Sequence, residues 1–150
     1  MSGVVVPLKT IARLSKIYEP EDWKVEVFRM FGNRMPEING NRVLCAVYLE
    51  GDFHLKGTRS DGTEYKILKS DDAKKESIWQ SKSMLVLAVG GAAFVDTSEY
   101  SHYGFKAKVG DWVSAKISNC SQAEFNEMPC RIIQDYLIET KMDDPRWLTS

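Results

Sequence analysis

The chain has 150 residues, with 20 basic and 21 acidic side chains and a formal net charge of −1. A chain of this length is expected to form one domain with an ordinary buried core. The balanced charge argues against a large basic surface that would hold nucleic acid, and no apolar run is as long as a membrane span. We therefore expect a soluble protein that is made in a cytosol and binds neither nucleic acid nor membranes.

The three cysteines, Cys45, Cys120 and Cys130, are an odd number at scattered spacing, without any Cys-x-x-Cys pair. Together with only two histidines, His54 and His102, they do not form the clusters that bind zinc. We expect at least two of the cysteines to be buried free thiols. A disulfide between Cys120 and Cys130 is the alternative if they face each other across a hairpin, although a reducing compartment argues against it.

A catalytic site would need a recognisable arrangement of side chains, and the sequence contains no nucleophile elbow, phosphate-binding glycine loop or zinc-protease motif. The adjacent carboxylates Asp71-Asp72 and Asp143-Asp144 would point to opposite faces of a strand, and in loops they are typical turn residues. We therefore expect no catalytic, cofactor-binding or metal-binding residues, no cofactor and no enzymatic activity.

Residues 1–20 are expected to form an N-terminal arm, which begins with Val4-Val5-Val6-Pro7-Leu8 and continues as a short helix over 10–18. Apolar residues then alternate with charged ones at Trp23, Val25 and Val27. Because a half-buried strand has a period of two residues, this pattern predicts a first strand over 23–29.

Two hairpin signals follow. Asn39-Gly40 precedes an apolar run at 42–49, and Asp61-Gly62 lies between alternating segments at 53–56 and 65–68. Both dipeptides tolerate the positive φ angles of tight hairpin turns. We therefore expect residues 32–69 to form an inserted β-hairpin region.

The pattern of the second half of the chain predicts short strands joined by turns. Residues 84–89 are apolar throughout, as in a strand buried on both faces, and Gly90-Gly91 ends them. A surface loop is expected at 96–103, followed by strands within 112–117, 130–135 and 136–142. This pattern predicts an all-β sandwich or barrel, with residues 21–150 as one domain.

Several motifs resemble the GroES-type co-chaperonins, and most closely the divergent copies carried by tailed phages. They are the segment Lys108-Val109-Gly110-Asp111-Trp112-Val113, the later strand that begins at Arg131, the terminal Asp144-Pro145, and the strand 83–90 that ends in glycine. The resemblance covers residues 23–31 and 78–146. It implies a Greek-key β-barrel and no catalytic chemistry.

Co-chaperonins of this family grip a chaperonin ring through a mobile loop after the first strand, where two glycines precede branched aliphatic residues. Residues 32–69 occupy that place and lack such a run. The aliphatic segment that includes Val43, Leu44 and Val47 is the candidate contact if the chain is a co-chaperonin that caps a ring and assists folding of capsid protein.

The favoured hypothesis is a structural subunit of the virion, most simply a capsid decoration protein or another assembly component. Its partners would be the major capsid protein or neighbouring copies of the chain in a homo-oligomer. Both ends of the chain carry apolar groups that a lone domain would rarely leave exposed. The expected partner interface comprises Val4, Val5, Val6, Leu8, Trp147 and Leu148.

Overall fold

The computed structural model describes residues 13–14, 17, 19–49, 54–58, 64–68, 81–95 and 105–148, with the backbone alone at 54–58 and 64–68. Its elements, in chain order, are α2 (Pro20–Phe31), β1 (Arg42–Val47), β2 (His54–Thr58), β3 (Glu64–Leu68), β4 (Ser83–Val89), β5 (Trp112–Ser114), η1 (Ile117–Asn119), β6 (Ser121–Phe125), β7 (Met128–Gln134), η2 (Asp135–Leu137), β8 (Thr140–Met142) and η3 (Pro145–Trp147).

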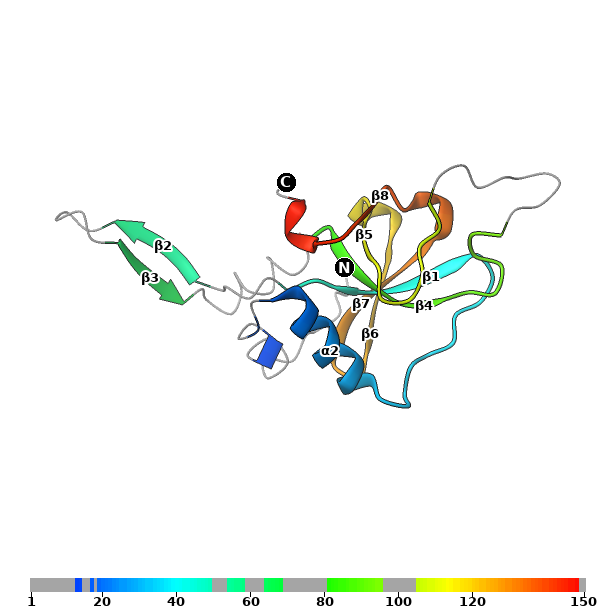
Figure 1. The fold of residues 1–150 in the computed structure, drawn as a ribbon, viewed down its shortest axis with the longest axis horizontal. Helices are drawn as coiled ribbons and strands as arrows, with labels where there is room; N and C mark the ends of the chain where they lie inside the picture. Colours follow the sequence, from blue (N-terminus) through cyan, green and yellow to red (C-terminus); the bar gives the residue numbers. More distant parts are fainter. Residues whose placement is uncertain are drawn as a thin grey trace.

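Six strands form one antiparallel sheet in the order β6-β7-β1-β4-β5-β8, while β2 and β3 form a separate two-stranded sheet (Figure 1). The predicted all-β class is therefore confirmed. The predicted apolar strand at 84–89 is also confirmed, because β4 pairs with both β1 and β5 and its first five residues are buried.

The predicted strand at 23–29 is wrong, because these residues lie within the helix α2. Trp23, Val27 and Phe31 recur every four residues and are all buried, which is the spacing of one helical face. Val25, which the strand pattern placed beside them, is 66% exposed. Pro20 opens the helix as its first residue, where a proline loses no intrahelical hydrogen bond.

The predicted hairpin of 53–56 with 65–68 is confirmed, since β2 pairs with β3 from His54 opposite Leu68 to Thr58 opposite Glu64. Its surroundings differ from the prediction, because β1 falls inside the expected insertion 32–69 and yet is an inner strand of the six-stranded sheet. The hairpin lies in the connection 48–82 between the neighbouring strands β1 and β4, and Figure 1 shows it apart from the main sheet.

Buried side chains cover both faces of the six-stranded sheet. On one face, Leu44, Leu85 and Cys130 pack with the inner face of α2, and we call this the helix-side core. On the other face lies a second cluster, the far-side core, that includes Val43, Cys45, Met84, Val86, Phe94, Ala107, Val113 and Ile133. Alternating residues of β1 and β4 thus enter opposite cores, as expected for inner strands.

Three aromatic rings hold α2 against the sheet. The ring of Trp23 lies 5.2 Å from that of Tyr48 and 5.6 Å from that of Trp112, and the last two rings are 5.4 Å apart. Tyr48 meets both tryptophans nearly edge to face, an arrangement that aromatic rings favour. The cluster joins the helix to the end of β1 and to β5.

Two predicted features lie partly or wholly outside the described residues. Of the arm helix at 10–18, the structure describes Arg13 and Leu14, which are helical, and Ile17. Leu14 is fully buried in the helix-side core. The surface loop expected at 96–103 lies entirely outside the described part of the chain.

Candidate interaction surface

The C-terminal turn η3 is joined to the sheet by one hydrogen bond and is held internally by a second set. The buried hydroxyl of Ser83, on β4, donates to the carbonyl oxygen of Pro145 at 2.9 Å. Asp144 caps the turn, because its Oδ1 accepts the backbone N–H of Arg146 at 2.8 Å. The Arg146 side chain also donates to Asp144, with a shortest distance of 2.7 Å, and this contact lowers the pKa of the carboxyl group.

This anchored turn holds an aromatic side chain in solvent. Pro145 is buried, whereas Trp147, two residues later, is 64% exposed. Leu148 beside it is partly buried. The exposure of the indole therefore does not arise from a loose chain end, because the turn that carries it is bonded to an inner strand. We call Trp147 and Leu148, with the turn that carries them, the tail face.

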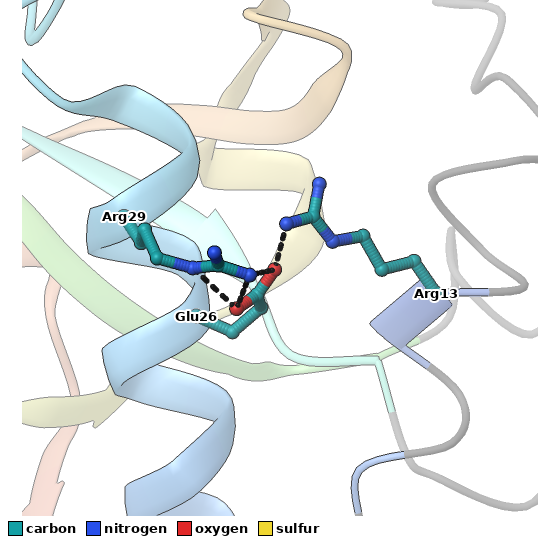
Figure 2. Close-up of polar contacts among 3 residues, drawn as sticks. All are labelled: Arg13, Glu26 and Arg29. Atoms are coloured by element: carbon teal, nitrogen blue, oxygen red, sulfur yellow. Dashed lines mark hydrogen bonds and ion pairs between the residues drawn. The ribbon is translucent and has the colours of Figure 1, made fainter.

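The start of the described chain is tied to α2 by one carboxylate and two guanidinium groups (Figure 2). Glu26 accepts hydrogen bonds from Arg29 at 2.7 to 2.9 Å, and it also forms an ion pair with Arg13. The Glu26 side chain is 13% exposed, whereas the side chains of Arg13 and Arg29 are 49% and 68% exposed, so the contacts form a surface network. Val4, Val5, Val6 and Leu8, the other half of the expected interface, lie outside the described residues.

The segment expected to touch a chaperonin lies in the interior. Val43, Leu44 and Val47 have no exposed surface, and β1 is hydrogen-bonded along both edges, to β7 and to β4. A partner could reach these side chains only if the central part of the sheet opened. In this fold the three residues stabilise the two cores and are no contact surface.

The cysteines are free thiols, and Cys45 and Cys130 are buried as expected. Burial raises the pKa of Cys45 and Cys120, and it raises the pKa of Cys130 to about 12. Protonated thiols are poor nucleophiles and poor metal ligands, so this arrangement favours packing over chemistry. Cys120 cannot pair with Cys130 across the β6–β7 hairpin, where Cys130 lies opposite Ala123.

Other residues that could carry chemistry are dispersed. Asp143 is exposed and Asp144 caps η3, while Asp71-Asp72 and His102 lie outside the described residues and His54 is described by its backbone alone. Within the described ranges, no three metal-ligating side chains come together, and no helix has the length and apolar character needed to span a bilayer.

A second set of exposed apolar residues was not predicted by any local sequence pattern. Val95, Phe105, Val109 and Tyr136 are each between 37% and 54% exposed. Val95 follows the turn after β4, Tyr136 follows β7, and Phe105 and Val109 precede β5. Only long-range pairing brings these segments together, so local periodicity could not reveal the surface.

Comparison of the chain with models of known protein families gives no match, and comparison with curated protein sequences gives none.

Proposed function

We propose that this chain is a non-enzymatic structural subunit of a tailed-phage particle, built on a GroES-like Greek-key barrel, which decorates the capsid or joins other virion parts. The observation that carries the proposal is the exposed Trp147 on an anchored turn. Tryptophan is strongly enriched among the residues that dominate binding energy at protein interfaces. A rigid turn that presents one loses little conformational entropy when a partner covers it.

The resemblance to the phage branch of the GroES family is the reason for proposing a subunit of a tailed-phage particle. Its segments coincide with the described elements β4, β5, β7 and η3. Gly110, in the segment before β5, has φ +93, a conformation that glycine adopts without strain, and its N–H donates to the carbonyl of Val86 at 2.9 Å. Residues 23–29 do not form the first strand that the resemblance implies, because they are helical.

Incorporation of tail-face variants into particles tests the proposal. Trp147→Ala should reduce incorporation about tenfold or more, because truncating such an anchor residue costs about 2 kcal/mol or more. Val25→Ala is the matched control, since Val25 is similarly exposed on α2. Circular dichroism should show both variants folded. Equal incorporation of the two variants would contradict the proposal that the tail face binds a partner in the particle.

A co-chaperonin is the second candidate function, and the β2–β3 hairpin is the observation in its favour. The hairpin pairs only with itself among the described strands, in the connection that follows β1. Since β1, and not residues 23–29, is the first strand of the sheet, residues 48–82 take the place of the mobile loop that the family resemblance implies. A hairpin of this kind could add to a chaperonin surface without disturbing the main sheet.

Co-sedimentation with an ATP-bound chaperonin ring tests this second candidate. The matched variant replaces residues 54–68 with a flexible glycine-serine linker of the same length. Ring binding and ATPase suppression that disappear with the linker would favour a co-chaperonin. Absence of ring binding by the wild-type chain would exclude it for the ring tested.

A further inference from the structure

The turn that leads into β1 carries the only Asn-Gly pair of the chain, and both of its residues lie in solvent. Gly40 has φ +64, and a Cβ atom built on it would meet no atom within 4 Å. The space on that side of the backbone is therefore open. Because glycine also has no side chain of its own, the side chain of Asn39 can reach the backbone nitrogen of Gly40 without obstruction.

The groups that would react with each other are free of hydrogen bonds. Over the part of the chain that the structure describes, the side-chain amide of Asn39 has no partner, and neither has the N–H of Gly40. The carbonyl oxygen of Asn39 accepts the N–H of Arg42 at 3.3 Å, which is long for such a bond. The peptide unit between Asn39 and Gly40 is therefore only weakly held and can turn toward the side chain.

The other four asparagines, which all lie within the described ranges, lack this combination. After Asn33, Asn41 and Asn119, the N–H of the next residue already donates to a carbonyl oxygen, at 2.8 to 3.3 Å. The side chains of Asn41 and Asn126 are themselves hydrogen-bonded, at 3.3 Å each. Each of the four also precedes a residue whose own side chain crowds the backbone nitrogen. The structure thus distinguishes Asn39 from every other asparagine of the chain.

We infer that Asn39 is a site of spontaneous deamidation, at which the chain modifies itself without an enzyme. The backbone nitrogen of Gly40 attacks Cγ of Asn39, and the new C–N bond closes a succinimide ring. The side-chain nitrogen leaves as ammonia and takes the proton from Gly40. Water then opens the ring at either carbonyl, which gives aspartate or isoaspartate at position 39 and one new negative charge. The two groups are held in one molecule, so proximity replaces a collision. The inference does not depend on the proposed function.

The product would lie at a junction of two turns. The carbonyl oxygen of Gly40 accepts the N–H of Ala92 at 2.9 Å, and it would lie 2.3 Å from a Cβ atom on Gly90. The turns before β1 and after β4 therefore touch through their backbones. Isoaspartate places an additional methylene group in the main chain just before Gly40, which shifts this carbonyl in a site without spare room. The isoaspartate form should be less stable than the original chain.

Peptide mapping by mass spectrometry tests the inference on purified full-length protein, incubated at mildly alkaline pH, where the attacking nitrogen loses its proton more readily. The mass change of an amide converted to an acid should accumulate at Asn39 at least about tenfold faster than at any other asparagine. A protein isoaspartate methyltransferase should label the same peptide. Asn39→Gln should abolish the label, because its longer side chain closes a different ring. Asn33→Gln is the matched control and should keep it.

Gly40→Ala is a second variant, and it should slow the reaction at Asn39 at least about tenfold, because a methyl group then crowds the nitrogen. Circular dichroism checks its folding, since φ +64 is strained for alanine. An Asn39 that stays intact while another asparagine reacts would overturn the inference. So would conversion to aspartate without isoaspartate, which would exclude the succinimide, or a label that persists in Asn39→Gln.

Thermal unfolding of the deamidated protein, separated by its added charge, tests the coupling between the turns. The isoaspartate form should melt at least about 2 °C below the fresh protein, because the hydrogen bond from Ala92 is weakened. Asn39→Asp is the matched control, since it carries the charge without the additional methylene group, and it should melt close to the fresh protein. Equal melting temperatures of the isoaspartate form and Asn39→Asp would overturn the coupling.

Discussion

The backbone N–H of Phe94 donates a buried 2.7 Å hydrogen bond to Oδ2 of Asp135, 41 residues later in the chain. The other carboxylate oxygen of Asp135 accepts from the N–H of Tyr136 at 2.7 Å and from the side chain of Asn41 at 3.3 Å. One carboxylate therefore joins the turns that follow β4 and β7 to the turn before β1. It also holds Phe94 at φ +58, a conformation that bulky residues rarely adopt.

Asp135→Ala should lower the free energy of unfolding by about 2–4 kcal/mol, because it leaves buried N–H groups without their charged acceptor. Denaturant unfolding monitored by circular dichroism measures this loss. Asp143→Ala, at an exposed acidic residue, should change stability by less than about 0.5 kcal/mol. Similar values for the two variants would contradict the role given to Asp135.

Gly90→Ala should destabilise the protein by about 1–3 kcal/mol or more, because the turn after β4 has no room for a side chain. A Cβ atom on Gly90 would lie 2.3 Å from the carbonyl oxygen of Gly40, which is backbone and cannot rotate away. The neighbouring Gly91 offers a matched control, since a Cβ there meets no atom within 4 Å. Thermal unfolding should therefore separate Gly90→Ala from Gly91→Ala, and equal melting temperatures would count against this packing.

Glu127→Gly should stabilise the protein by about 0.5–1 kcal/mol, because glycine adopts positive φ without strain. Asn126 and Glu127 form the two-residue turn between β6 and β7, with φ +53 and φ +64, as in the primed turns that favour Asn-Gly. Asn126→Gly should bring less benefit, since asparagine already tolerates this conformation. Chemical denaturation compares the two, and a destabilised Glu127→Gly would show that the carboxylate outweighs the strain.

Stability should fall as the pH rises above about 9, because unfolding then releases a proton from Cys130. Burial raises the pKa of this thiol from 9.0 to about 12, so between these values the folded thiol is protonated and the unfolded one is ionised. The contribution of Cys130 is fully present below about pH 9 and is lost toward pH 12, with a slope of at most about 1.4 kcal/mol per pH unit. Cys130→Ala should show a shallower decline in urea unfolding, and an unchanged slope would contradict the burial effect.

The sequence predicted the elements whose patterns were local. Residues 84–89 are apolar without interruption, and the pairing of 53–56 with 65–68 is marked by an Asp-Gly turn. The strand prediction for residues 23–29 was wrong because their apolar positions fit both the period of a helix and the period of a strand. Trp23 and Val27 are four residues apart, a spacing that places them on one face of a helix and also on one face of a strand. The acidic residues directly after Pro20 are the signal that favours a helix.

The interaction surfaces could be predicted only in part. Trp147 was expected at a partner interface from its position near the chain end, and the structure places it in solvent. The anchor that holds it there, Ser83, is more than sixty residues away in sequence and carries no local signal. The same limit hid the exposed apolar residues Val95, Phe105, Val109 and Tyr136 and the buried carboxylate of Asp135, because their positions depend on strand pairing.

Since we propose a tailed-phage origin, quantitative mass spectrometry of purified particles of the proposed phage tests the central claim most directly. The structural-subunit account predicts the protein in intact, washed particles at a fixed number of copies relative to the major capsid protein. Absence from such particles, together with binding of the purified chain to an ATP-loaded chaperonin ring, would contradict that account and favour the co-chaperonin.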